Sequence, residues 1–107
     1  MIKNSTSDTK LNLKVLHLES TKDKLLGAVK YKESVLFLKT RLGIHTFFVK
    51  TPLDILILDK NKRIVRIKEE LLPNRVYFWN LRYSLVLELP RGVVKKLKLK
   101  VGHMVEF

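Results

Sequence analysis

The stretch Leu53-Asp54-Ile55-Leu56-Ile57-Leu58 decides the fold class, because it has no polar face after Asp54. Such a run is typical of an interior strand that is covered on both sides. Residues 59–62, Asp-Lys-Asn-Lys, then have the composition of a turn. They lead into the β-prone residues 63–68, so the sequence predicts a hairpin whose first strand lies inside a sheet.

Further β-prone segments lie on both sides of this hairpin. Each contains a short apolar or alternating run: 11–18, 35–38, 45–49, 75–79, 84–89 and 104–107. Short helices are expected over 20–27 and 93–97, and the short connections favour antiparallel pairing. We therefore predict a mainly β fold, a small antiparallel β-sandwich or partly closed barrel of about seven short strands with one or two short helices.

The length of 107 residues leaves room for one hydrophobic core. Residues 1–10 are polar and lack periodicity, which predicts a flexible N-terminal arm followed by a single domain over 11–107. Because the chain has no cysteine, disulfides and thiolate nucleophiles are excluded. His17, His45 and His103 are far apart in sequence and lack the spacing of a helical zinc pair, so neither a metal nor a cofactor is expected.

The composition bears on location and partners. No segment has the apolar length of a signal peptide or a membrane span, so we expect a cytoplasmic protein without a membrane partner. The absence of Gln and Cys and the abundance of Lys fit a heat-adapted or AT-rich source. A formal net charge of +12 suggests nucleic acid. The basic residues are spread over the whole chain, however, which favours a solvated basic surface.

His45 and Asp54 are the first candidates for chemistry. Asp54 shares strand parity with Leu56 and Leu58, so its carboxylate is expected to face a dry environment. It should then accept hydrogen bonds from backbone amides, Thr46 or His45. One interpretation makes His45 and Asp54 an acid–base pair. The other, which we favour because no nucleophile lies nearby in sequence, makes them a hydrogen-bonded peg between two strands.

Other polar and aromatic side chains could contact a ligand or a partner. Glu88 could pair with Lys50 or Arg66 across the sheet. Aromatic and basic residues interleave over 75–83, where an exposed Trp79 would stack on a base or on a partner's side chain, although core packing is the commoner role. The candidate ligand or partner contacts are Thr46, Lys50, Trp79 and Glu88.

The densest basic patch lies near the C-terminus. It could hold phosphates at a helix start, or it could be the solvated face of an amphipathic helix, which we favour. Its residues are Arg91, Lys95, Lys96, Lys98 and Lys100.

Several motifs resemble those of the domain of unknown function 192 family. Residues 43–59, Gly-Ile-His-Thr-Phe-Phe-Val-Lys-Thr-Pro-Leu-Asp-Ile-Leu-Ile-Leu-Asp, are similar to its His-Thr-Phe, Met-Arg-Phe-Pro-Ile-Asp and apolar strand. Residues 85–92 resemble its Val-Leu-Glu-Leu-Pro-Ala-Gly, and residues 99–103 its Leu-x-Val-Gly-Asp. Lys62 stands where the family's hairpin turn usually has Gly, and His103 where it has Asp. The resemblance implies a compact β-sandwich-like domain and no firm activity, because the family is uncharacterised.

Three hypotheses for the function remain open. A non-catalytic binding module would contact a partner or a small ligand through loops around 39–46 and 73–83. An enzyme would use His45 and Asp54 in hydrolytic or proton-transfer chemistry. A nucleic-acid binder would use the basic patch near the C-terminus and the aromatic–basic loop. We favour the binding module, because the chain has no recognisable catalytic constellation.

Overall fold

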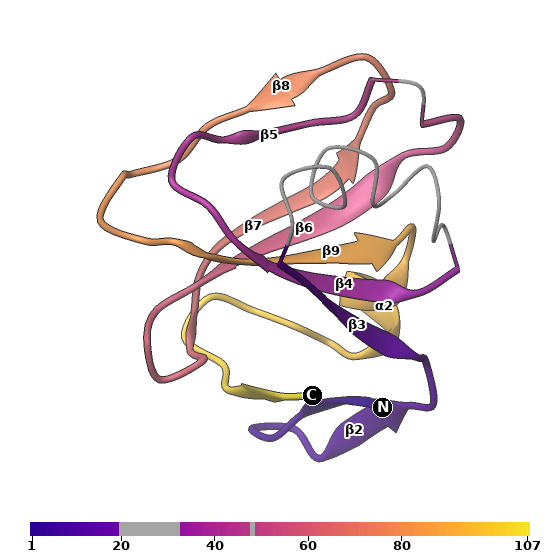
Figure 1. Cartoon of the computed structure of the whole chain (residues 1–107). Helices are drawn as coiled ribbons and strands as arrows, with labels where there is room; N and C mark the ends of the chain where they lie inside the picture. Colours follow the sequence, from indigo (N-terminus) through magenta and orange to yellow (C-terminus); the bar gives the residue numbers. More distant parts are fainter. Residues whose placement is uncertain (20–32, 48) are drawn as a thin grey trace.

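The computed structural model describes residues 1–19, 33–47 and 49–107, and within them the chain forms three sheets (Figure 1). The central sheet has the strand order β3 (Val15–Leu18), β4 (Val35–Lys39), β9 (Leu85–Pro90), β6 (Leu53–Leu58) and β7 (Ile64–Leu71). A second sheet has the order β10 (Val105–Glu106), β1 (Ile2–Asn4) and β2 (Thr9–Leu11). The third pairs β5 (Ile44–His45) with β8 (Val76–Tyr77). The short helix α2 spans Val93–Lys96.

The predicted mainly β class is confirmed, with ten strands among the described residues in place of about seven. The described strands do not close into a barrel, and the helix predicted over 20–27 lies outside the described residues. The prediction of antiparallel pairing is wrong for one pair, because β3 and β4 run parallel. A parallel pair needs a long crossover connection, and residues 19–34 supply that length.

Strand β6 is the interior strand that its sequence predicts. All of its residues are buried, and it pairs antiparallel with β9 on one side and with β7 on the other. The turn that follows is also confirmed, because the Lys62 N–H donates to the Asp59 carbonyl over 3.0 Å. Strand β7 continues to Leu71, beyond the predicted end at residue 68.

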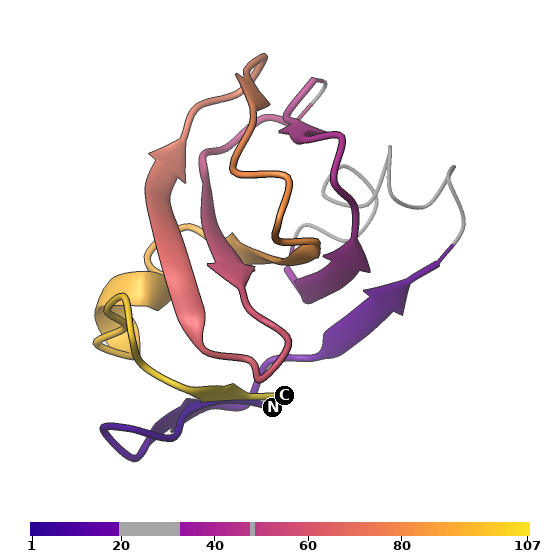
Figure 2. The same ribbon diagram turned by 90° about the vertical axis from the view of Figure 1, so that its left-hand side faces the viewer.

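Two hydrophobic clusters cover the two faces of the central sheet. One contains Ile55 and Ile57 of β6 and lies beneath the β5–β8 pair. The other contains Leu56 and Leu58 and is covered by α2 and the sheet with both chain ends. Figure 2 shows this layering, with β5 and β8 at the top and the two termini side by side at the bottom. Alternate side chains of β6 therefore pack into two different hydrophobic clusters, one on each face of the sheet.

The N-terminal residues correct the predicted flexible arm. Residues 1–10 contribute β1 and most of β2, which form an antiparallel pair, and β1 also pairs with β10. Ile2 is fully buried, and the Asn4 side-chain amide donates to the Leu97 carbonyl over 2.9 Å. The Asn4 side-chain oxygen accepts from the N–H of Thr6 over 3.0 Å. Polar composition misled the prediction because Asn4 finds its partners inside the protein, far away in sequence.

Candidate functional site

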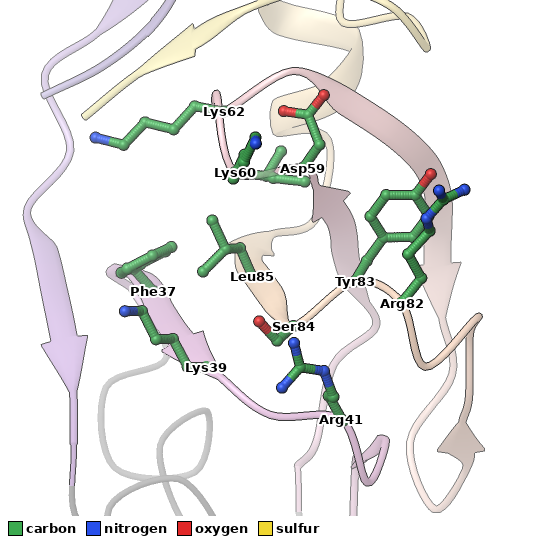
Figure 3. Close-up of a pocket in the computed structure, with 11 residues that line it drawn as sticks. Phe37, Lys39, Arg41, Asp59, Lys60, Lys62, Arg82, Tyr83, Ser84 and Leu85 are labelled. Atoms are coloured by element: carbon green, nitrogen blue, oxygen red, sulfur yellow. The ribbon is translucent and has the colours of Figure 1, made fainter.

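A pocket opens at one end of the central strands, where β4 and β6 end and β9 begins (Figure 3). Its volume is about 590 Å³. Phe37, Leu58 and Leu85 come from three adjacent strands and give the pocket an apolar lining. We call this cavity the basic pocket, because its other walls carry five basic side chains: Lys39, Arg41, Lys60, Lys62 and Arg82.

The basic pocket has little negative charge of its own. Asp59 is the single acidic residue in its lining. The Asp59 Oδ1 atom accepts from the backbone N–H groups of Asn61 and Arg63 over 2.9 and 3.0 Å, so this carboxylate holds the turn. Within the described ranges, no ion pair joins any of the five basic side chains to a carboxylate. Their positive charges therefore add up over one concave surface.

Two interlocked turns position the two arginines of the basic pocket. The Arg41 Nε–H donates to the Leu81 carbonyl over 3.0 Å, and the Thr40 N–H donates to the Ser84 carbonyl over 2.9 Å. The N–H of Arg82 donates to the Asn80 side-chain oxygen over 3.0 Å. The Arg41 contact uses Nε, which leaves the terminal guanidinium nitrogens directed toward the pocket in Figure 3. Guanidinium groups in this arrangement can bind a planar or tetrahedral anion through paired hydrogen bonds.

Lys62 occupies a backbone conformation that favours glycine. Its φ is 64°, in the left-handed region, and it lines the basic pocket. A side chain there costs about 1 kcal/mol relative to a relaxed backbone. Lys62 Nζ also lies 4.4 Å from the centre of the Phe107 ring, which stabilises the charge at this wall. A lysine in this position thus adds a basic residue to the pocket lining, with its ammonium group over the Phe107 ring.

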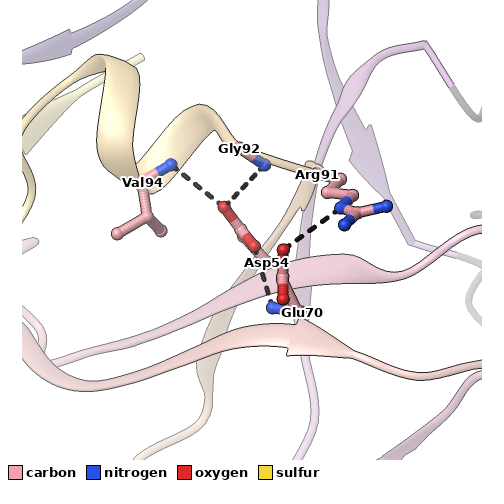
Figure 4. A network of polar contacts seen from close by, with 5 residues as sticks. All are labelled: Asp54, Glu70, Arg91, Gly92 and Val94. Atoms are coloured by element: carbon pink, nitrogen blue, oxygen red, sulfur yellow. Dashed lines mark hydrogen bonds and ion pairs between the residues drawn. The ribbon is translucent and has the colours of Figure 1, made fainter.

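Asp54 lies at the opposite end of the same strands and has a different environment (Figure 4). Its side chain is 1% exposed. The Oδ1 atom accepts from the N–H of Glu70 over 3.0 Å, and Oδ2 accepts from the N–H groups of Gly92 and Val94, each over 3.1 Å. The predicted donors are therefore backbone amides, which tie β6 to β7 and to the start of α2.

His45 does not join Asp54. Its Nδ1 accepts from the N–H of Phe47 over 3.2 Å, and its ring stacks on Phe47 with centroids 4.9 Å apart. No hydrogen bond links His45 to Asp54 in the described part of the chain. The geometry therefore does not support the acid–base interpretation, which needs His45 and Asp54 to form a pair. The hydrogen bonds of Asp54 are those expected of a structural peg between strands.

Thr46 is a second internal peg. The side chain is fully buried, its hydroxyl donates to the Leu72 carbonyl over 2.7 Å, and it accepts from the N–H of Arg75 over 2.9 Å. These contacts hold the loop after β7 against β5. Lys50, in contrast, is exposed. Thr46 is therefore buried and Lys50 is exposed, although both were predicted to contact a ligand or a partner.

Glu88 is buried among apolar neighbours. It is 4% exposed and lies between Leu36 of β4 and Ile55 of β6. Burial raises the pKa of Glu88 to about 7. The predicted pairing with Lys50 or Arg66 is not found, because neither forms an ion pair with Glu88 in the described part of the chain. The Arg66 guanidinium instead lies 5.4 Å from the centre of the Tyr77 ring.

Trp79 is a core residue. It is 8% exposed, and its indole N–H donates to the Tyr83 carbonyl over 2.7 Å. The prediction of an exposed tryptophan is therefore wrong, and the core-packing alternative is confirmed. The neighbouring Phe78 is 63% exposed and is the aromatic residue of this loop that solvent reaches most freely.

The basic patch near the C-terminus has no common cavity with the basic pocket. Arg91 pairs with Glu70, with 3.2 Å between Nε and Oε1. Lys95 and Lys96 are exposed on α2, and Lys98 is exposed just after it. The apolar side of this segment, Val93 and Val94, packs into the core, as the amphipathic pattern predicts. The arrangement is that of a solvated helix face.

The described residues form neither a metal-ligand cluster nor a membrane-spanning helix. Among the residues that the structure describes, no cluster of His, Asp and Glu side chains has the size and spacing to hold a metal ion. The described helix is too short and too polar to cross a bilayer.

Comparison with known proteins gives the family. Residues 6–107 match DUF192, described as "Uncharacterized ACR". The chain belongs to the DUF192 family. A UPF0127 protein of Pyrococcus horikoshii is 33% identical over 75 residues, which are 68% of this chain and 64% of the relative. A UPF0127 protein of Pyrococcus abyssi is 38% identical over 64 residues, 60% of this chain and 54% of the relative. The matches thus span less than two thirds of these relatives.

Solved structures share the DUF192 fold of this chain. A protein of unknown function from Novosphingobium aromaticivorans has a TM-score of 0.66 at 18% identity, over 87% of this chain and 72% of the other. A Sinorhizobium meliloti protein described as a "putative transcription regulator" has a TM-score of 0.72 at 20% identity, over 98% of this chain and 88% of the other. At these identities the likeness shows the fold alone.

Sequence reasoning missed the basic pocket, although its parts were visible. The basic loop at 39–41 and the turn at 59–62 each follow a β-prone run, and Arg82 precedes another. In an antiparallel sheet the end of one strand lies beside the start of its neighbour, so basic residues at these positions lie at the same end of the sheet. The missing information was the strand order β4-β9-β6, which brings the three segments together.

Proposed function

We propose that this DUF192 protein is a non-catalytic binding module that holds a phosphate-bearing anion in the basic pocket. The observation that carries the proposal is that five basic side chains, none with a carboxylate partner in the described part, line one cavity. Binding an anion there would neutralise charges that otherwise repel one another.

The shape of the basic pocket supports a ligand larger than a single ion. Its volume of about 590 Å³ falls in the usual range for small-molecule sites. The partly exposed apolar side chains of Phe37 and Leu85 would contact an uncharged part of the ligand, while the basic walls contact its phosphates. The lining has no acid–base pair aimed at a common point, which supports binding over catalysis.

The test compares charge reversal at the two basic regions. Inorganic tripolyphosphate is titrated into the full chain by isothermal titration calorimetry, at low and at moderate salt. The variant Lys39→Glu/Lys60→Glu changes two exposed walls of the basic pocket, and Lys95→Glu/Lys96→Glu makes the same charge change on α2. We expect the first variant to bind roughly a hundredfold more weakly and the second to bind within about threefold of wild type. Equal losses in both variants, or no binding by wild type at low salt, would contradict the proposal.

Nucleic acid is a second candidate ligand. The Sinorhizobium meliloti neighbour's description supports it, as does the exposure of Phe78 near Arg82, since aromatic rings can stack on bases. A single-stranded oligonucleotide that binds with a steep salt dependence, and loses affinity in Phe78→Ser, would favour this candidate over a small phosphate-bearing ligand.

A further inference from the structure

Three large apolar side chains project from the two turns beside the basic pocket. Leu42 is 87% exposed, Leu81 is 65% exposed and Phe78 is 63% exposed. We call these three residues the apolar tip. Burial of leucine and phenylalanine side chains is favourable, and exposed ones do not gain this free energy. Three of them beside a binding site therefore indicate a surface that is covered in use.

The backbone that carries the apolar tip is held by specific contacts. The hydrogen bond from Arg41 Nε to the Leu81 carbonyl, 3.0 Å long, joins the two turns. The ring of Phe78 lies so close to Gly43, whose φ is 89°, that a Cβ at this position would come within 2.6 Å of it. The exposure of these side chains therefore follows from ordered turns rather than from a frayed loop.

The apolar tip and the basic pocket lie at the same end of the molecule. Arg41 precedes Leu42 and Arg82 follows Leu81, and both arginines line the basic pocket. Figure 1 shows the turns near residues 41, 60 and 81 together at its left side, and in Figure 2 they face the viewer. One flat partner could therefore contact the apolar and the basic groups together.

We propose that this end of the protein docks on a bilayer that contains anionic lipids. The apolar tip enters the boundary between headgroups and acyl chains, and the basic pocket holds a lipid phosphate. The combination of exposed aliphatic side chains with neighbouring cations is the pattern of proteins that bind at the membrane interface. This inference rests on the proposed function, because it names the source of the phosphate. This proposal departs from the expectation, stated above, that the protein has no membrane partner. That expectation rested on the lack of a membrane-spanning segment, which docking at a surface does not need.

Other occupants of the apolar tip fit the structure less well. A second copy of the chain would bring together two molecules with a formal net charge of +12 each, and they repel. A nucleic-acid strand would use the ring of Phe78, but the side chains of Leu42 and Leu81 have no π face on which a base can stack.

The test is cosedimentation of the full chain with vesicles. Vesicles of phosphatidylcholine with phosphatidylglycerol are compared with vesicles of phosphatidylcholine alone. Leu42→Ser/Leu81→Ser shortens the apolar tip. The control Val101→Ser changes an apolar residue outside the tip that is 62% exposed, close to the 65% of Leu81. We expect wild type and Val101→Ser to bind the anionic vesicles alike, the tip variant to bind roughly tenfold more weakly or less, and none to bind neutral vesicles well.

The outcomes separate this inference from the proposed function. Tripolyphosphate binding should be the same in the tip variant as in wild type, because Leu42 and Leu81 do not line the basic pocket. If anionic vesicles fail to bind while tripolyphosphate binds, docking is wrong and the proposed function stands. Equal vesicle binding by wild type and the tip variant would also overturn docking, as would tip-dependent binding of an oligonucleotide without vesicle binding. If the wild-type protein does not bind tripolyphosphate, both the docking inference and the proposed function are wrong.

Discussion

Strands β6 and β9 carry polar groups of opposite kinds at their two ends. At one end Asp54 is 1% exposed, and backbone N–H groups from three residues occupy its two oxygens. At the other end the five basic side chains of the basic pocket have no carboxylate partner in the described ranges. Polar groups that are satisfied internally specify the fold, whereas those that converge without internal partners remain available for a ligand.

The contrast matters because the candidate acid–base residues in the sequence lie at the end opposite the basic pocket. The motifs that resemble the family signature contain Asp54, Glu88 and Arg91. All three lie toward the end of the strands that holds Asp54, which we call the closed end, whereas the end with the basic pocket is the open end. Glu88 shows that burial there has a cost, because burial raises the pKa of its carboxyl to about 7.

The largest expected effect is at Asp54. Replacing Asp54 by Ala leaves the N–H groups of Glu70, Gly92 and Val94 without their acceptor. We expect the free energy of unfolding to fall by about 4 kcal/mol. Urea denaturation measures it, with the exposed Glu69→Ala as control. A loss below about 1 kcal/mol would show that Asp54 is not a structural peg.

Glu88→Gln should show a pH-dependent gain in stability. The folded-state pKa of Glu88, about 7, lies above the ordinary value of 4.5 for a glutamate, so the folded state binds the extra proton between these values. Wild-type stability therefore falls as pH rises through this window. Relative to wild type, the variant should gain about 2.5 kcal/mol on going from pH 5 to pH 8. A difference that does not change with pH in denaturation experiments would contradict the raised pKa of the buried Glu88 carboxyl.

Much of the closed end could be predicted from sequence, and the reason lies in local pattern. The run of apolar residues after Asp54 predicts β6 and the burial of the carboxylate, because strand periodicity is a property of neighbouring residues. The partners of Asp54 lie 16, 38 and 40 positions away, so their identity required the fold. The basic pocket and the N-terminal strands were missed for the same reason, since their contacts join segments distant in sequence.

Thr46→Val gives a smaller effect on stability. The valine keeps the shape but neither donates to the Leu72 carbonyl nor accepts from the N–H of Arg75. We expect a loss of about 2 kcal/mol in the free energy of unfolding. Thr51→Val is the matched control, because Thr51 is exposed. Equal stabilities for the two variants would mean that Thr46 does not hold the loop.

Lys62→Gly has the smallest expected effect on stability and separates fold from binding. Glycine suits the backbone at φ 64° but loses the cation near Phe107, so the two changes nearly cancel, within about 1 kcal/mol. Tripolyphosphate affinity should still fall several-fold, because Lys62 lines the basic pocket. Unchanged affinity in calorimetry would remove Lys62 from the binding site.

The difference between the two ends is tested most directly by mapping where an anion binds. Tripolyphosphate is titrated into ¹⁵N-labelled protein at low salt, and the amide chemical shifts are followed by NMR. Saturable changes should be confined to residues 39–41, 59–62 and 82–85, around the basic pocket. Changes centred on 91–100 and α2, or no saturable changes at all, would contradict the assignment of ligand binding to the open end of the strands.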